Sequence, residues 1–273
     1  MHTRLPESAI LQLSGSDASH FAHNQLMSDV AALPDGGWQW SGWLSPKGRL
    51  VAFFACIRVD AQTLLLWLPA GGADELAARL QRFIFRSKVK LDADSGWQAV
   101  AFIGEPAAPG EGELRLDLPG DAAEPSRHLL LTRQPHGEAV DAELVARWRR
   151  ADLRLGVPYI SPGLANSEQF VPQWLSLQRL NAFDLKKGCY PGQEIVARMH
   201  YLGQSKRAAY RLIGQGEPPA PMTRILGAAN SAIGEVVWQQ ADEPSWLAMA
   251  VLAKDRLDGP LHLDGGEAVC IDD

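Results

Sequence analysis

The chain has 273 residues, a formal net charge of −6 at pH 7 and three cysteines. A chain of this length can bury a large core and is long enough for two or three compact units. The acidic balance argues against strong direct nucleic-acid binding, because proteins that grip the phosphate backbone rely on clustered Lys and Arg.

The cysteine count and the apolar pattern bear on the compartment. Cys56, Cys189 and Cys270 are an odd number without the spacing of a disulfide framework, which favours a reducing cytosol. The sequence shows no basic-then-apolar leader and no apolar run of about eighteen residues. We therefore expect a cytoplasmic protein that neither binds nor crosses a membrane.

The first hundred residues predict strands interrupted by two helices. Strand patterns cover residues 9–13, 38–44, 50–59, 63–68 and 97–103. The turn at 45–48 joins two of them, which makes antiparallel pairing the simplest arrangement. One helix is expected after Asp17, with Phe21, Leu26 and Val30 on its apolar face, and another from Ala73 to about Phe85.

The middle of the chain predicts a surface connection followed by a longer helix. Residues 104–126 are rich in Pro, Gly and acids, with a short strand expected at 114–118. A strand at 128–132 leads to a helix that begins near Asp141 and ends at Pro158. Apolar residues recur at helical spacing within it, at Leu144, Val145, Trp148 and Leu155.

The last third changes character twice. Residues 161–192 are expected to be irregular, as a segment that lines a site would be. From Ser205 onward, short strands alternate with Gly and Pro clusters, at residues 208–213, 233–238, 247–252 and 261–271. This alternation predicts a small antiparallel barrel.

The run from Lys186 to Arg198, KKGCYPGQEIVAR, places one thiol between lysines and the expected start of a helix. A nearby ammonium, here that of Lys187, and the positive end of a helix both favour the thiolate, the form that attacks electrophiles or binds metal. Pro191 and Gly192 supply the turn before the helix. Cys189 is therefore a candidate reactive residue, and a buried cysteine in a structural turn is the alternative.

This run, extended through Gly203, resembles the signature of the YgfZ family, read as K-G-C-Y-x-G-Q-E-x-x-A-R. Members are folate-binding proteins related to the T-protein (aminomethyltransferase) of the glycine cleavage system, and they are linked to iron–sulfur cluster assembly or repair. Residues 166–173 and 24–30 resemble two further segments of the family, so the likeness spans almost the whole chain.

The resemblance implies a GcvT-like, multidomain α+β fold. Two mixed α/β, ferredoxin-like units would occupy residues 1–204, interleaved in sequence, and a C-terminal β-barrel domain would occupy residues 205–273. All three would surround a central folate site with Cys189 at its edge.

The resemblance also implies a ligand and its contacts. The cofactor would be tetrahydrofolate or another reduced folate. Trp148 is the candidate that stacks on the pterin ring, with plain helix core as the alternative. The other candidate contacts lie in the motif, at Tyr190, Gln193, Glu194 and Arg198. The glutamate tail is an anion, and either of two basic groups, residues 79–90 and 147–154, could hold it or be a solvated helix face.

No resident metal site is expected. One cysteine cannot hold a cluster, since four thiolates are the usual requirement, so a transient iron–sulfur cluster would be shared with another molecule. The partners implied are folate and iron–sulfur enzymes or cluster-assembly proteins. Whether Cys189 acts by metal ligation, by redox chemistry or by thiol exchange stays open.

Two departures from the T-protein pattern help to choose between an accessory protein and a transferase. T-proteins carry an acidic pair where residues 48–53 of this chain have no acid, and Arg154 stands where many relatives have Glu. We favour an accessory protein that binds folate and supports iron–sulfur clusters through Cys189, with indirect effects on tRNA modification. The alternative is a tetrahydrofolate-dependent aminomethyl or one-carbon transferase.

Overall fold

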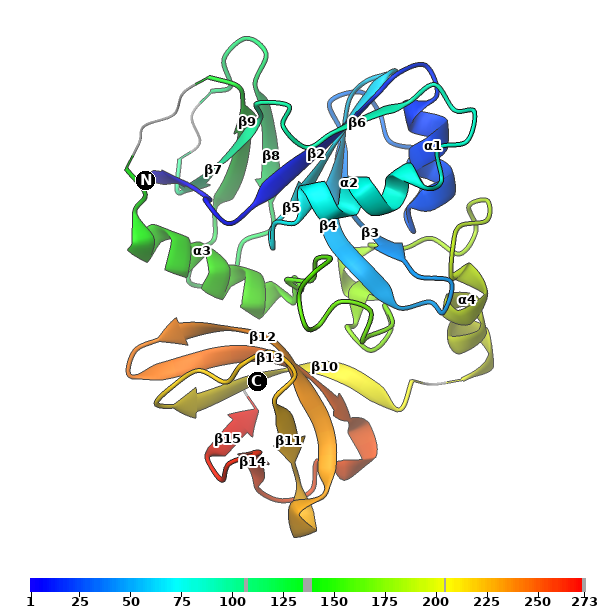
Figure 1. The fold of residues 1–273 in the computed structure, drawn as a ribbon. Coiled ribbons are helices and arrows are strands. Elements are labelled where there is room, and N and C mark those ends of the chain that lie inside the picture. Colours follow the sequence, from blue (N-terminus) through cyan, green and yellow to red (C-terminus); the bar gives the residue numbers. More distant parts are fainter. Residues whose placement is uncertain (106–107, 135–138, 204, 272–273) are drawn as a thin grey trace.

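The computed structural model describes residues 1–105, 108–134, 139–203 and 205–271. Two sheets with their helices form the upper part of the molecule, and a β-barrel lies below them (Figure 1). An irregular segment runs between these parts and ends in a short helix. The mixed α+β class with a C-terminal barrel, predicted from the sequence, is confirmed.

The first sheet has five antiparallel strands in the order β3-β4-β5-β2-β6. Its strands are β2 (Ala9–Ser14), β3 (Trp38–Leu44), β4 (Leu50–Asp60), β5 (Thr63–Leu68) and β6 (Lys90–Asp92). Side chains of β4 alternate between two cores: Phe54 and Cys56 pack with helices α1 (Ala18–Gln25) and α2 (Ala73–Gln81), and Phe53 and Ala55 pack in the centre of the molecule. Burial on both faces explains why β4 is almost continuously apolar.

The second sheet takes its first strand from the start of the chain. Its order is β1-β7-β9-β8, from β1 (His2–Arg4), β7 (Gln98–Ile103), β8 (Leu114–Leu118) and β9 (Arg127–Thr132). Because β2 to β6 belong to the other sheet, the two units are interleaved in sequence. Helix α3 (Ala142–Leu155) packs with this sheet, and the Asp141 carboxylate accepts the backbone N–H of Leu144 at its start.

Two expected helices are shorter than predicted. α1 ends at Gln25, and Leu26 is extended and bridges to Trp43 of β3, so Leu26 and Val30 do not lie on a helix. At the point where the chain leaves α1, the ammonium of Lys187 donates to the carbonyl oxygens of His23, Leu26 and Ser28, which stabilises the extended backbone there. α2 likewise ends at Gln81, before the expected Phe85.

The barrel is closed by six antiparallel strands in the order β10-β13-β12-β11-β14-β15. They are β10 (Arg207–Gln215), β11 (Arg224–Leu226), β12 (Ala232–Asp242), β13 (Ser245–Ala253), β14 (Leu261–Leu263) and β15 (Ala268–Ile271). The single strand expected at 261–271 is two strands, since Gly265 and Gly266 take positive φ between them. Closure leaves no long free edge, because every strand pairs on both sides.

The segment between α3 and α4 (Gln193–Leu202) ties the sheets to the barrel. Its Phe170 carbonyl accepts from Leu50 of β4, and the Asn166 amide donates to carbonyls of Tyr159 and of Val237 in the barrel. Only a short 3-10 turn, Leu177–Leu180, interrupts its irregular course. The sequence-predicted irregularity is confirmed, and the segment delivers the cysteine motif to the surface.

Candidate functional site

The cysteine motif occupies the loop that leads into α4. Gly192 caps the helix in the left-handed region, with φ of 78°, and α4 begins at Gln193 as the Pro-Gly turn predicted. Cys189 is exposed, three residues before the cap, whereas its neighbours Lys187 and Tyr190 are buried. The thiol thus stands on a loop that is held from both sides.

Lys187 holds the loop to the end of α1. Its ammonium donates to the carbonyl oxygens of His23, Leu26 and Ser28, and the residue is 8% exposed. Burial lowers the pKa of Lys187 to about 8, against the opposing charges of Asp29 and Asp184. The recorded partners of this ammonium are main-chain oxygens, so the expected role in activating Cys189 receives no support from the geometry.

Tyr190 is the second anchor. Its ring is 6% exposed and lies 5.0 Å from the Lys187 nitrogen, a cation–π contact. Burial, and to a lesser extent the charge of Asp184, raises the pKa of its phenol above the usual range. The hydroxyl is buried and has no hydrogen-bond partner in the part of the chain that the structure describes.

A close backbone approach forms the third anchor. A Cβ on Gly192 would lie 2.6 Å from the carbonyl oxygen of Ser45, and one on Gly48 would lie 2.7 Å from the Cβ of Ile195. The β3–β4 turn is therefore pressed against the start of α4, and two glycines permit the contact. This contact joins the motif to the first sheet.

The remaining motif candidates surround the loop without forming one pocket. Gln193 donates through its amide to the Lys187 carbonyl, 3.4 Å away, and so braces the loop. Glu194 and Arg198 are exposed on α4, as predicted for its outer face. Their proposed contact with folate stays a prediction.

Trp148 lies elsewhere. It sits in α3, on the opposite side of the molecule from α4 in Figure 1, and its side chain is fully buried. The Arg127 guanidinium covers its ring at 4.5 Å and pairs with the buried Asp152 carboxylate at 2.9 Å. The ring offers no exposed face for a pterin, so the stacking role receives no support from the geometry.

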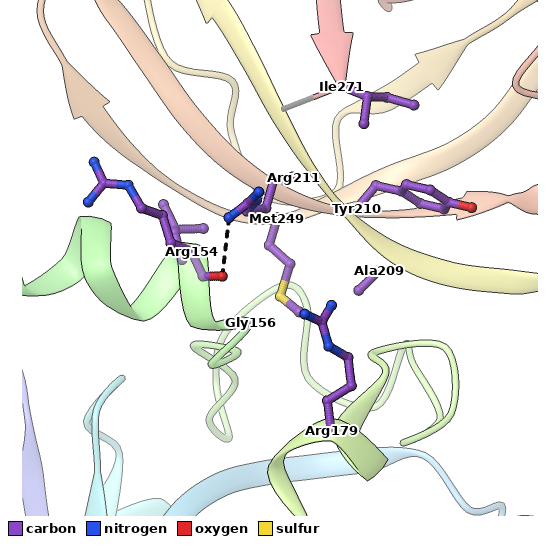
Figure 2. A pocket seen from close by; sticks show the side chains of 9 residues that line it. Arg154, Gly156, Arg179, Ala209, Tyr210, Arg211, Met249 and Ile271 are labelled. Atoms are coloured by element: carbon purple, nitrogen blue, oxygen red, sulfur yellow. Dashed lines mark hydrogen bonds between the residues drawn. The ribbon is translucent and has the colours of Figure 1, made fainter. Parts of the chain in front are cut away.

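A pocket that the sequence did not define opens between the end of α3 and the barrel. Its volume is about 450 Å³. Figure 2 shows Arg211 from β10 donating to the backbone carbonyl of Arg154, and Arg179 from the 3-10 turn beside Met249, whereas the Arg154 side chain points away from them. The remaining lining is Leu153, Gly156, Ala209, Tyr210 and Ile271. Among these described lining residues there is no carboxylate, so the pocket suits an anion with an apolar body.

The three arginines of the pocket are held differently. Arg211 donates to the Arg154 carbonyl at 3.4 Å, and Arg154 reaches Asp121 at 3.3 Å. Arg179 is exposed, and no described residue forms a hydrogen bond or ion pair with its guanidinium. Arg154 belongs to a basic group noted in the sequence, but Arg179 and Arg211 had no local signal, because folding alone brings their three segments together.

Sequence comparison with known proteins shows the family of this chain. No family model matches it. The tRNA-modifying protein YgfZ of Vibrio vulnificus is 30% identical over 250 residues, which cover 86% of this chain and 75% of that protein. The chain belongs to the YgfZ family. The tRNA-modifying protein YgfZ of Colwellia psychrerythraea is 27% identical over 277 residues, covering 92% of this chain and 85% of that protein.

The fold also has a solved neighbour. The glycine cleavage system aminomethyltransferase T of Bartonella henselae superposes with a TM-score of 0.68 at 13% identity, over all of this chain and 84% of that one. The GcvT-like fold implied by the sequence motif is thereby confirmed for this member of the YgfZ family. At this identity the likeness concerns the fold alone.

The described residues also exclude two features. They contain no group of three or more His, Cys, Asp or Glu placed to hold a metal ion. Within the same ranges, none of the helices has both the length and the apolar character needed to span a bilayer.

Proposed function

We propose that this chain is an accessory protein that binds a reduced folate and supports assembly or repair of iron–sulfur clusters in partner enzymes through Cys189. The relatives named tRNA-modifying proteins support a link to tRNA modification. That link is indirect here, since modifying enzymes that carry such clusters would be the clients. The overall charge of −6 is unfavourable for a broad grip on tRNA itself.

The observation that carries the proposal is the exposure of Cys189 on an anchored loop. A structural cysteine is normally buried, as Cys56 is in β4, where burial raises the pKa of the thiol to about 12. Cys189 instead faces solvent between the buried Lys187 and Tyr190. A fixed and accessible thiol can meet a partner's metal or thiol, and a shared cluster needs ligands from a second molecule.

The arginine pocket fits the acidic end of a folate. Guanidinium groups bind carboxylates with two parallel hydrogen bonds, and the glutamate tail carries two carboxylates. Arg179 would hold one of them, with Tyr210 and Met249 against the apolar body of the ligand. A bound reduced folate supplies one-carbon and redox chemistry at its pterin, for which Trp148 provides no open surface.

Tetrahydrofolate titrated into the protein tests the pocket. We expect Arg179→Ala to weaken binding by about tenfold, the loss of roughly one charge-assisted pair. Arg256→Ala, an exposed arginine of the barrel outside the pocket, is the matched control and should bind as wild type does. Equal affinity of Arg179→Ala and wild type, or no binding to either, would reject this pocket as the folate site.

Complementation tests the thiol. In a strain lacking the protein, Cys189→Ser should fail to restore the activity of iron–sulfur enzymes, and Cys270→Ser, which changes the other exposed cysteine, should restore it. Full restoration by Cys189→Ser would sink the proposal. Purified protein given a reduced folate and an aminomethyl donor should show no turnover, and turnover above background would favour the transferase instead.

A further inference from the structure

A second hollow lies directly beside the cysteine motif. Its volume is about 360 Å³. Its lining is mainly apolar and comes from β3, the β3–β4 turn, β4, α2 and the motif: Trp43, Leu44, Ser45, Pro46, Val51, Arg79, Arg82, Phe83, Glu168 and Pro191. We call it the Trp43 groove. Pro191 is two residues from Cys189, so whatever occupies the groove lies near the thiol.

The walls of the groove are fixed. Phe83 meets Trp43 edge to face, with ring centroids 5.7 Å apart, and Trp43 is 6% exposed. Two residues further on, Phe85 is 86% exposed. Phe85 follows the lining residue Phe83 by two positions, and covering its side chain would release about 25 cal/mol for each Å² buried.

The segment that follows α2, residues 82–88, carries unbalanced positive charge, and its Arg82 and Phe83 line the groove. Arg79 is neutralised by Glu168 at 2.6 Å, whereas Arg82, Arg86 and Lys88 are exposed and have no side-chain ion pair with any described residue. Asp17 lies in the same region, but its carboxylate accepts the backbone N–H of Lys88 at 2.7 Å. A basic segment whose Arg82 lines an apolar groove favours a ligand that combines carboxylates with an apolar side chain.

We propose that the Trp43 groove docks an acidic segment of a protein partner, with one apolar side chain in the groove and its carboxylates on Arg82, Arg86 and Lys88. Docking there holds the partner beside Cys189, and this consequence rests on the proposed function of the thiol. A polypeptide fits better than RNA, because the chain as a whole is acidic and the lining aromatics Trp43 and Phe83 already pack edge to face on each other.

Directed alkylation tests the docking. The probe is the peptide Glu-Asp-Phe-Glu-Asp-Leu-Glu with an N-terminal chloroacetyl group, whose chloride a cysteine thiolate displaces to form a thioether. The control probe has Lys in place of every acid. Mass spectrometry gives the ratio of alkylation at Cys189 to that at Cys270, the other exposed cysteine, which serves as an internal reference. Docking raises the local peptide concentration at Cys189, so this ratio should be at least about tenfold higher for the acidic probe.

Matched variants show whether the groove is responsible. Arg82→Glu should bring the ratio for the acidic probe down to that of the basic probe, and Arg256→Glu, an equal charge change on the barrel, should leave it high. Replacing Phe in the probe by Ala should lower the ratio as well. Unchanged melting temperatures of both protein variants would show that folding is intact.

Three results would overturn the docking proposal. One is the same ratio for acidic and basic probes. Another is stronger competition by RNA: if a short uridine oligonucleotide lowers alkylation of Cys189 by the acidic probe more than the same peptide without its chloroacetyl group does, the groove is an RNA site. The last is a dimer in sedimentation that Phe85→Ser dissociates, since the groove would then be covered by a second copy. None of these results touches folate binding or the complementation by Cys189, which are measured separately.

Discussion

Two buried cations stabilise different regions of this molecule by different means. In the α3 unit, Arg127 is 1% exposed and faces the carboxylate of Asp152, which also accepts from the Tyr159 hydroxyl at 2.8 Å. In the cysteine motif, Lys187 is 8% exposed, donates to three main-chain oxygens and lies over the Tyr190 ring, with no carboxylate bonded to it among the described residues. A carboxylate cancels a buried charge, whereas carbonyl dipoles only solvate it, so the pKa of Lys187 is lowered to about 8.

This difference distinguishes the buried core of the α3 unit from the exposed loop that carries Cys189. The ion pair of Arg127 is internal to one unit, and Trp148 packs on it. Lys187 joins two segments 159 or more residues apart and keeps the thiol-bearing loop against α1. The cysteine motif therefore depends on a long-range anchor of modest strength, and the α3 unit depends on a strong local one.

The largest effect is expected from breaking the ion pair. Arg127→Met should lower the free energy of unfolding by about 3–5 kcal/mol, because the Asp152 carboxylate would stay buried without its partner. Urea unfolding measures the loss. Arg115→Met is the control, since its pair with Asp117 is exposed and worth less than about 1 kcal/mol. Equal losses in the two variants would show that burial of the pair does not matter.

Removal of the second cation should cost less. Lys187→Met leaves three main-chain oxygens without a donor but also relieves a buried charge, so we expect a net loss of roughly 2–3 kcal/mol in the free energy of unfolding. The adjacent Lys186 is exposed, and Lys186→Met should change stability by less than about 0.5 kcal/mol. A Lys187→Met protein as stable as Lys186→Met would remove Lys187 from the anchors of the loop.

The close contact between Gly192 and the β3–β4 turn can be tested by a substitution with an expected stability loss similar to that of Lys187→Met. Gly192→Ala combines a positive φ of 78° with a Cβ only 2.6 Å from the Ser45 oxygen, and we expect a loss of about 2–3 kcal/mol in thermal unfolding. Gly36 has nearly the same φ, 76°, and open space around its Cβ position. Gly36→Ala should therefore cost about 1 kcal/mol, the strain alone. Equal stability losses in Gly192→Ala and Gly36→Ala would mean that the β3–β4 turn moves to accommodate the added Cβ at little cost.

The sequence predicted local features well and long-range ones poorly. The strands and the turn before α4 followed from periodicity and from Pro191 and Gly192, which act on their own neighbours. The end of α1 at Gln25 did not, because the contacts there come from distant segments, including the bond from Lys187, 161 residues further along, to the Leu26 carbonyl. For the same reason the contacts of Lys187 with the end of α1 and the place of Arg179 in a pocket had no local signal.

The change of the free energy of unfolding with pH tests whether the Lys187 ammonium is buried without a neutralising carboxylate. Below pH 8 the ammonium is charged in both the folded and the unfolded chain, and its burial cost is fully present. Between about pH 8 and the ordinary pKa near 10.5, the folded chain loses this proton while the unfolded chain keeps it, so stability rises with pH. From pH 7 to pH 9.5 the gain should be about 2 kcal/mol for a pKa lowered to about 8.

Cys56 acts in the opposite direction over part of this range. Burial raises its pKa to about 12, so the folded chain keeps a proton that the unfolded chain loses near pH 9, and stability falls. The two effects separate in a comparison of wild type with Lys187→Met, since both proteins contain Cys56. The difference in their free energies of unfolding should widen by about 2 kcal/mol in favour of wild type between pH 7 and 9.5. A difference that stays constant would mean that Lys187 is as well neutralised as Arg127, and the contrast between the two cations would disappear.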